Sequence, residues 1–420
     1  MLVIEGRVFI KGELKQAAVG IEEGKIVDVK KVLKGDTHID VGNRIILPGA
    51  VDPHVHFRDP GMTNKEDFIT GSLAAIHGGV TCVLDMPNTK PPVTNKRTLE
   101  EKKRTIRGRS FVDYGLFAAL TSKNDVHELS KNVCGFKLFM GSTTGEILVD
   151  DDRSIYRALA AASATGKRVS VHAEDNNMIS EKDEKNNRDH LKNRPVSAEH
   201  NAIRRLSAFK GMKVNICHIT DAASVELATS LGFTTEVTTH HLLFADSVSE
   251  SAEYKVNPPL RDMNTRDALV KAFREDKITM FGTDHAPHAL DEKRSSYGDA
   301  PNGIPGVETN VPIMMNFVKK GDMNLSQLIR MASAAPAEAF SLNKGKIEKG
   351  YDADLMIFDT RISRTIKAKD MHSKCGHTPY EGMEAIFPYM VFVRGEMQIK
   401  DGELCGEMLG LDVNDGGRWE

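Results

Sequence analysis

Residues 45–58, IILPGAVDPHVHFR, join an apolar, β-branched run to a pair of histidines. The run predicts a buried strand over Ile45–Val51, with chemistry at its C-terminal end. Other short apolar runs end in the same way, at Lys137, His172, His218 and Asp284. Polar residues at the C-terminal ends of several strands are how a parallel (β/α) barrel builds its active site. The pattern therefore predicts such a barrel, with these side chains gathered at one mouth.

Strand and helix patterns alternate through the middle of the chain, which favours a parallel sheet. The predicted strands are Ile45–Val51, Val80–Asp85, Phe111–Phe117, Gly135–Leu138, Arg168–Val171, Lys213–Cys217, Thr234–Thr238 and Lys277–Phe281. The predicted helices include Asn64–Ile76, Ser154–Ala164, Ser197–Ala208, Ser224–Ser230, Asn264–Arg274 and Leu325–Ala334. Eight strands with helical crossovers indicate a closed, TIM-type (β/α)8 barrel.

Both ends of the chain are rich in short strands and tight turns. The clearest strands are Leu2–Ile10, Lys15–Glu22, Lys25–Val32, Leu355–Phe358, Phe387–Val393 and Glu396–Ile399. We predict a small β-sandwich domain assembled from residues 1–48 and 345–420, beside a metal-dependent barrel over 49–344.

The composition is typical of a globular enzyme. The chain has 420 residues, of which 40% are hydrophobic and 27% charged, with a net charge of -3. It shows neither a dense basic block, as nucleic-acid binding needs, nor the roughly 20 apolar residues of a membrane span. Its strand-like first ten residues lead us to expect no cleavable leader. We expect a cytoplasmic protein with no nucleic-acid or membrane partner. Its five cysteines are widely spread and are expected to be reduced thiols.

The histidines and the aspartate are residue types that bind zinc when several converge. In a His-x-His pair at a strand end, His54 and His56 face the same side because side chains alternate. Taken singly, His172 and His218 are more often core histidines, and their matched places at successive strand ends favour ligands instead. Asp284 is predicted both to bind metal and to act as general acid and base. A helix-capping role is its alternative.

Lys137 sits in the apolar strand GFKLF, residues 135–139. The simpler interpretation is a lysine that snorkels or pairs with an acid. The sharper one is that its amine has reacted with CO₂ to form a carbamate, an anion that can bridge two cations. Two metals about 3.5–4 Å apart would share a hydroxide for attack on a carbonyl.

Further polar residues follow the predicted strands and form a candidate substrate site. The guanidinium fork of Arg58 suits a carboxylate, although without the neighbouring histidines it would be an ordinary surface arginine. His240 and His241 follow the seventh strand, where one of them is expected to orient a ligand rather than bind metal. The other substrate-binding candidates are His56, Asn88, Asn257, His288, Asn302 and Gly303.

The ligand set, which places Lys after strand 4 and Asp after strand 8, resembles that of the amidohydrolase superfamily over essentially the whole chain. Within it the chain looks most like the dihydroorotases. The matching motifs are HVHFRDPG (54–61), MPNT (86–89), NPPLR (257–261), DHAPH (284–288) and SKCGHTPYEG (373–382).

The resemblance implies reversible cyclisation of N-carbamoyl-L-aspartate to L-dihydroorotate in the de novo pathway to UMP. It also implies two Zn²⁺ ions per chain, bridged by N6-carboxylated Lys137 and held by His54, His56, His172, His218 and Asp284. Metal-bridged hydroxide would attack the substrate, with Asp284 as general acid and base. The ligand types agree with zinc and leave manganese and cobalt open.

Alternatives remain at this point. Arg58 favours dihydroorotase over hydantoinases, which lack that arginine, and over allantoinases, which usually place an asparagine there. Many bacterial dihydroorotases use a bridging aspartate, so the run Asp150–Asp152 is the second candidate for the bridge. Other readings are an allantoinase or another cyclic amidase, or a catalytically silent scaffold. The chain is also a candidate homo-oligomer, or a subunit associated with a carbamoyltransferase.

Overall fold

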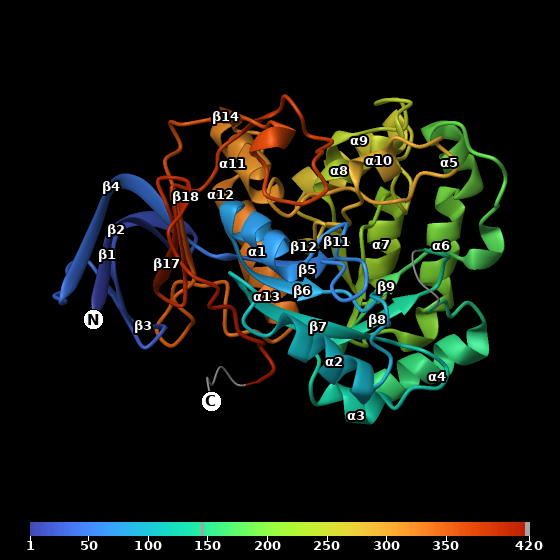
Figure 1. Ribbon diagram of the computed structural model, residues 1–420, viewed down its shortest axis with the longest axis horizontal. Helices are drawn as coiled ribbons and strands as arrows, with labels where there is room; N and C mark the ends of the chain where they lie inside the picture. Colours follow the sequence, from blue (N-terminus) through green and yellow to red (C-terminus); the bar gives the residue numbers. More distant parts are fainter. Residues whose placement is uncertain (144–146, 416–420) are drawn as a thin grey trace.

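Eight parallel strands form the centre of the molecule in the computed structural model, which describes residues 1–143 and 147–415. They pair in sequence order, and the helices that connect them surround the sheet (Figure 1). The prediction of a (β/α)8 barrel is confirmed. The barrel strands are β5 (Ala50–Val55), β6 (Val80–Asp85), β7 (Asp113–Ala119), β8 (Gly135–Phe139), β9 (Arg168–His172), β10 (Val214–Ile216), β11 (Thr234–Val237) and β12 (Met280–Phe281).

The barrel closes between its first and last strands. His285 forms a parallel bridge with Val55, and its carbonyl oxygen accepts a hydrogen bond from His56 N at 2.8 Å. Asp52 adds a second link, because its carboxylate accepts bonds from Thr283 N at 3.1 Å and Thr283 Oγ1 at 2.5 Å. These bonds bring the end of β5 beside the end of β12, where His54 and Asp284 lie.

Two predicted strand boundaries are wrong. The apolar run Ile45–Val51 is not one strand, because the chain passes at Gly49 from β4 of the terminal sheet to β5 of the barrel. A Cβ on Gly49 would lie 2.3 Å from Thr81 Oγ1, so only glycine fits this crossing. The last barrel strand is shorter than Lys277–Phe281. There the backbone nitrogens of Thr235 and Thr279 bond to each other's side-chain oxygens instead of to backbone.

The helices lie close to their predicted places. Several begin at a side-chain cap, such as Asp67 before α1 and Asp221 before α7, which satisfies exposed N–H groups of the first turn. The helices are α1 (Phe68–His77), α2 (Lys96–Ile106), α3 (Val126–Ser130), α4 (Asp152–Ser163), α5 (Asn187–Asn193), α6 (Val196–Arg205), α7 (Ala222–Ser230), α8 (Thr239–Leu243), α9 (Met263–Arg274), α10 (Leu290–Lys293), α11 (Asn310–Lys320), α12 (Leu325–Ile329) and α13 (Ala335–Ala339). A π-helical turn, Arg330–Ala334, joins α12 to α13.

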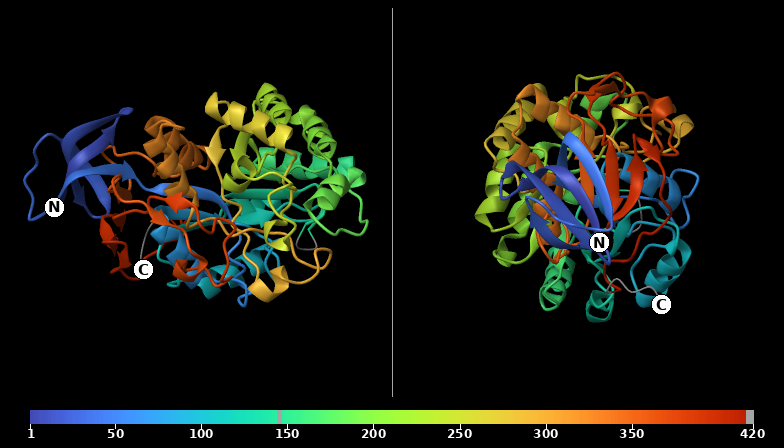
Figure 2. Two further views of the ribbon diagram at one scale, coloured as in Figure 1. Left: turned by 90° about the horizontal axis from the view of Figure 1, so that it is seen from above. Right: turned by 90° about the vertical axis from the view of Figure 1, so that its left-hand side faces the viewer.

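Strands from both ends of the chain form a second sheet beside the barrel (Figure 2). It covers its own apolar cluster, which includes Ile4, Val19, Leu355 and Phe392. Its order is β18-β17-β16-β13-β4-β1-β2-β3, so β13 and β4 join the two ends. The strands are β1 (Leu2–Ile10), β2 (Glu13–Glu22), β3 (Lys25–Lys30), β4 (Thr37–Pro48), β13 (Leu355–Phe358), β16 (Met390–Val393), β17 (Glu396–Lys400) and β18 (Glu403–Leu404), with a separate pair β14 (Arg364–Thr365) and β15 (Glu384–Ala385).

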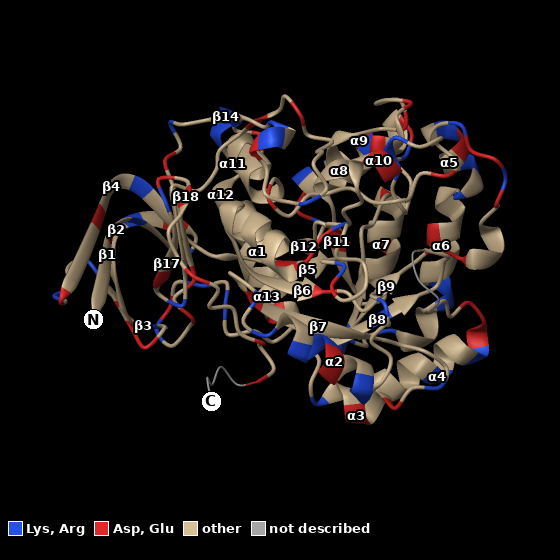
Figure 3. Cartoon of the chain, in the orientation of Figure 1, with Lys and Arg blue, Asp and Glu red and all other residues tan. Residues whose placement is uncertain are grey.

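The sheet agrees with a small β-domain built from both termini. The exact domain limits, 1–48 with 345–420 against 49–344, stay a prediction, and residues 416–420 lie outside the described part. Lys, Arg, Asp and Glu are interspersed over the described chain (Figure 3). None of the helices among the described residues is long and apolar enough to span a membrane.

A buried ion cluster joins the terminal sheet to the barrel. Lys344 is 3% exposed, and its Nζ lies 2.7 Å from Asp113, 2.9 Å from Asp352 and 2.8 Å from Asp354. Asp113 begins β7 and Asp354 precedes β13, so one ammonium group neutralises carboxylates from both sheets.

Replacing Lys344 by methionine is expected to lower the free energy of unfolding by about 3–5 kcal/mol, because it removes the buried ammonium that Asp113, Asp352 and Asp354 share. Urea denaturation measures the change, and the exposed Lys349→Met serves as the control within about 0.5 kcal/mol. A Lys344→Met protein as stable as wild type would contradict the role of the cluster.

Candidate metal and substrate site

Three predicted ligands meet at the junction of the first and last barrel strands. His54 Nε2 lies 3.3 Å from Asp284 Oδ1, and His56 Nε2 lies 3.0 Å from the same oxygen. All three side chains are buried and can hold a metal ion together. Period-two alternation along β5 brings both imidazoles to the same face, as the His-x-His spacing predicts.

The other two histidines form a second group. His172 at the end of β9 and His218 just after β10 face each other, with His172 Nδ1 3.0 Å from His218 Nε2. The rings of His54 and His218 are 5.4 Å apart between centroids, so the two groups adjoin.

Lys137 lies between these groups on β8. Its Nζ is 3.4 Å from His54 Nε2 and 3.1 Å from Cys217 Sγ, and the residue is 1% exposed. Among the described residues no carboxylate forms an ion pair with it, so the expectation of a lysine paired with an acid does not fit. A buried ammonium without a counter-ion is costly, whereas an anionic form of this side chain would suit the surrounding imidazoles.

The geometry fits tetrahedral metal coordination. Zinc with ligands at about 2.0–2.2 Å separates neighbouring ligand atoms by about 3.3–3.6 Å, close to the distances within each group. Burial lowers the pKa of His56 to about 3 and that of His218 well below its usual range. Both rings are therefore neutral at pH 7, which is the form that binds metal.

Two carboxylates that sequence analysis missed orient the histidines. Glu236 on β11 lies 2.6 Å from His54 Nδ1, and Glu174 lies 2.8 Å from His172 Nε2. Arg194 in turn donates to Glu174 at 2.6 Å. A carboxylate on the far nitrogen fixes the tautomer and the ring plane of a ligand histidine. The available signal for Glu236 was an acidic residue inside an otherwise buried strand.

Backbone strain also gathers at this site. Arg58, His218 and Asp284 have φ values of 60°, 35° and 47°, in the left-handed region that non-glycine residues rarely adopt. Strained backbone of this kind persists where the surrounding structure holds it and clusters at functional sites.

The run Asp150–Asp152 is engaged elsewhere. Asp151 caps α4 by accepting from Ser154 N at 2.8 Å, and Asp150 accepts from Asn176 Nδ2 at 3.0 Å. Asp152 pairs with Arg205 at the surface. None of these carboxylates contacts the ligand histidines, so the structure favours Lys137 over this run.

The substrate candidates beside the first metal group form two sets of close polar contacts. Asn88 Oδ1 lies 2.7 Å from His56 Nδ1, and Arg58 Nη2 lies 3.1 Å from His288 Nε2. Lys65, which sequence analysis missed, contacts His288 Nδ1 at 3.0 Å.

The loop that follows α10 contacts His288. The carbonyl oxygen of Asn302 lies 3.0 Å from His288 Nε2. Gly303 has φ 150°, and a Cβ there would lie 2.2 Å from Ala286 O, so this close approach requires glycine. Asn257 is placed differently, since its Oδ1 faces His190 Nε2 at 2.9 Å.

His240 and His241 are both buried beyond β11. His241 bonds to Thr238 Oγ1 at 2.8 Å and to Pro258 O at 3.0 Å, whereas neither ring nitrogen of His240 has a hydrogen-bond partner within residues 1–143 and 147–415. Neither histidine is hydrogen bonded to a predicted metal ligand. No contact therefore supports the prediction that one of them orients a ligand. Glu236 and Glu174 occupy that place instead.

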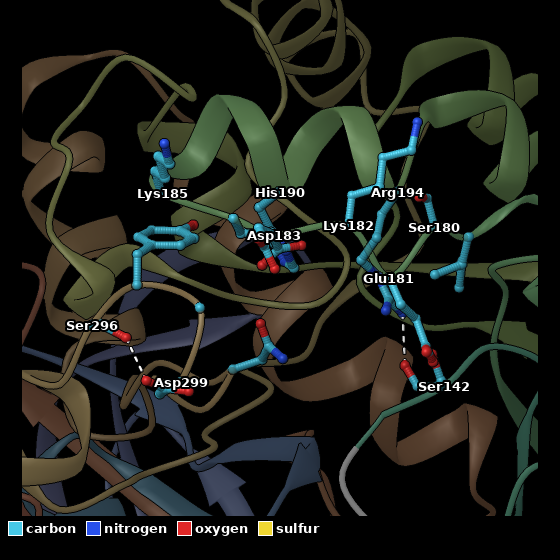
Figure 4. A pocket seen from close by; sticks show the side chains of 15 residues that line it. Ser142, Ser180, Glu181, Lys182, Asp183, Lys185, His190, Arg194, Ser296 and Asp299 are labelled. Carbon is cyan, nitrogen blue, oxygen red and sulfur yellow. Dashed lines mark hydrogen bonds and ion pairs between the residues drawn. The ribbon is translucent and has the colours of Figure 1, made fainter.

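A cavity of about 780 Å³ opens beside this site (Figure 4). Its lining includes Asn302, His190 and Arg194, so it borders the substrate candidates on one side and the support of His172 on the other.

Comparison with known proteins agrees with this site. The model of the amidohydrolase family matches residues 45–397. A dihydroorotase of Methanosarcina acetivorans is 38% identical, covering 93% of this chain and 90% of that protein. That of Pyrococcus furiosus is 36% identical, covering 97% and 95%. Among solved structures, L-hydantoinase from Arthrobacter aurescens has a TM-score of 0.92 at 27% identity, covering 98% and 99%. The chain therefore belongs to the amidohydrolase family, and within it to the dihydroorotases.

Proposed function

We propose that this protein is a metal-dependent dihydroorotase that interconverts N-carbamoyl-L-aspartate and L-dihydroorotate on the route to UMP. The observation that carries the substrate assignment is Arg58. It is 3% exposed, and among the described residues no carboxylate forms an ion pair with it. Burial lowers its pKa to about 10, so the guanidinium is still charged at neutral pH. A buried charge whose protein contacts include no carboxylate is suited to an anionic ligand, and dihydroorotate carries a ring carboxylate.

The metal site takes two Zn²⁺ ions in this proposal. His54 and His56 would hold one, His172 and His218 would hold the other, and N6-carboxylated Lys137 would be shared between them. Asp284 completes the first group. When bound, the pair supplies a hydroxide at neutral pH and polarises the substrate carbonyl. Lys137 Nζ lies 3.4 Å from His54 Nε2 and 3.1 Å from Sγ of Cys217, the residue before His218, and this placement supports the bridging role.

Asp284 handles the proton. In the hydrolytic direction its carboxylate takes the proton of the attacking water and passes it to the ring nitrogen as the amide bond breaks. In the biosynthetic direction the carbamoyl nitrogen attacks the side-chain carboxyl carbon of aspartate. Asp284 accepts the nitrogen's proton and returns it to the departing carboxylate oxygen, which takes a second proton from solvent and leaves as water. Burial raises the pKa of Asp284, but the neighbouring His54 and His56 have the larger, opposite effect. The net pKa lies well below its usual range, so the carboxylate is ionised and can accept that proton.

The remaining candidates hold the substrate. Arg58, Asn88, Asn257 and His288 would bind its carboxylate, while His56 and the backbone of Asn302 and Gly303 would contact the ring. The proposal also includes assembly, either as a homo-oligomer or with a carbamoyltransferase. It further includes a cytoplasmic location.

Replacing Arg58 by methionine is expected to raise KM for L-dihydroorotate about 10²-fold, because the variant loses a charge-assisted contact to the substrate carboxylate. Steady-state kinetics with dihydroorotate and with dihydrouracil, which lacks that carboxylate, measure the effect. The surface variant Arg361→Met is the control. An unchanged KM for dihydroorotate, or wild-type turnover of allantoin in place of dihydroorotate, would contradict the substrate assignment.

A further inference from the structure

His190 links the wall of the cavity in Figure 4 to the substrate site. It lies on α5 and is 3% exposed. Its Nδ1 is 2.8 Å from Glu184 Oε1, and its Nε2 is 2.9 Å from Asn257 Oδ1 and 3.0 Å from Val256 O. The ring therefore faces oxygen atoms on both sides.

Oxygen acceptors on both sides settle how the ring bonds. Carboxylate and carbonyl oxygens only accept, so both ring nitrogens of His190 donate, as in the imidazolium form. Glu184 is the matching anion. Burial raises the pKa of Glu184, but hydrogen bonds from His190, Asn193 and Lys255 outweigh that effect and bring the pKa down to about 2. The pair is thus a buried, charge-assisted link that is stronger than a neutral hydrogen bond.

This link fixes the amide of Asn257. Since Oδ1 accepts from His190, the Nδ2 group carries the donors that remain for a ligand. We infer that Glu184 and His190 are positioning residues that turn the amide N–H groups of Asn257 toward the substrate carboxylate. This inference rests on the proposed function, in which Asn257 binds that carboxylate.

The same segment is held from its other side. Lys255 Nζ lies 3.1 Å from Glu184 Oε2 and donates to Tyr297 O at 2.8 Å. The carbonyl oxygen of Lys255 accepts from Gly303 N at 3.0 Å and from Lys293 Nζ at 3.0 Å. Glu184 therefore contacts both the histidine that orients Asn257 and the lysine two residues before Asn257, while Lys255 ties this segment to the loop of Gly303.

The test is a double-mutant cycle between His190 and Asn257. His190→Phe keeps a ring of similar size and removes both donors, and we expect KM for dihydroorotate to rise about tenfold with kcat changed less than about threefold. In the Asn257→Ala background the same change is expected to alter KM by less than about twofold, because its target is gone. Glu184→Gln, which keeps shape and removes charge, is expected to raise KM in the same direction.

A second histidine–carboxylate pair supplies the matched control. His200 Nε2 lies 2.7 Å from Asp221 Oδ2 and contacts none of the substrate candidates. His200→Phe is expected to leave KM unchanged. Zinc content and melting temperature of each variant show whether the metal site and the fold persist.

The outcomes distinguish a failure of the proposed function from a failure of the positioning role of Glu184 and His190, called the relay below. Wild type that does not turn over dihydroorotate overturns the proposed function, and an unchanged KM in Asn257→Ala overturns the role of Asn257 together with the relay. If Asn257→Ala raises KM and His190→Phe raises it equally in both backgrounds, the relay alone is overturned. A crystal structure of His190→Phe tests the relay without any substrate: we expect the Asn257 side chain to leave its wild-type rotamer, and an unchanged rotamer overturns the relay.

Discussion

Lys137→Ala is expected to lose bound metal and to turn over dihydroorotate at least about 10³-fold more slowly than wild type. The bridge holds both metals in this account, and metal ions supply several kcal/mol of transition-state stabilisation. Lys137 Nζ lies 3.4 Å from His54 Nε2 and has no carboxylate partner among the described residues. Zinc analysis of the purified variant and steady-state kinetics measure the two losses.

A matched variant separates the missing bridge from general damage. In Lys137→Ala the shortened side chain leaves room in which acetate or propionate can replace the carbamate, so millimolar short-chain acid is expected to restore part of the metal and the activity. Lys137→Met fills the same space and is expected to show no such rescue. If Lys137→Ala keeps its metal and its rate, the bridge lies elsewhere.

Asp284→Asn is expected to lower kcat by about 10³-fold or more. General acid–base catalysis alone contributes about 10²–10⁴-fold, and asparagine keeps the volume while losing the ability to take a proton. Kinetics of hydrolysis near pH 8 and of cyclisation near pH 6 should show the loss in both directions, because the same carboxylate serves both.

The control for that variant is another aspartate near the barrel mouth. Asp151→Asn is expected to keep full activity and metal, because asparagine also caps a helix and Asp151 bonds Ser154 N rather than a histidine. Loss of metal in Asp151→Asn would make the Asp150–Asp152 run a candidate for the bridging ligand again. A kcat of Asp284→Asn within tenfold of wild type would contradict the proton-transfer role.

The convergence of the candidate metal ligands could be predicted because each lies on or just after a barrel strand. Period-two alternation put His54 and His56 on one face, and barrel topology brought His172, His218 and Asp284 to the same mouth. None of this required knowledge of distant side-chain contacts, so the local pattern sufficed.

The supporting residues could not be found in that way. Glu236 contacts His54 across 182 positions of sequence, and His190 reaches Asn257 across 67. Glu236 was visible as an acidic residue within the predicted strand Thr234–Thr238, but nothing in the local pattern identifies His54 as its partner or pairs His190 with Asn257. The break of the first strand at Gly49 was also hidden, because residues on both sides are buried and the apolar run is continuous. A Cβ at Gly49 would meet Thr81 on the neighbouring strand, and that contact is likewise invisible in the local pattern.

The most direct test of the central claim is a zinc titration of chelator-treated protein, followed by the rate of L-dihydroorotate hydrolysis in the presence of bicarbonate. The account predicts that the apoprotein is inactive and that the rate reaches its full value at two zinc ions per chain. Full turnover without metal, or a fully zinc-loaded protein that leaves dihydroorotate intact, would contradict it.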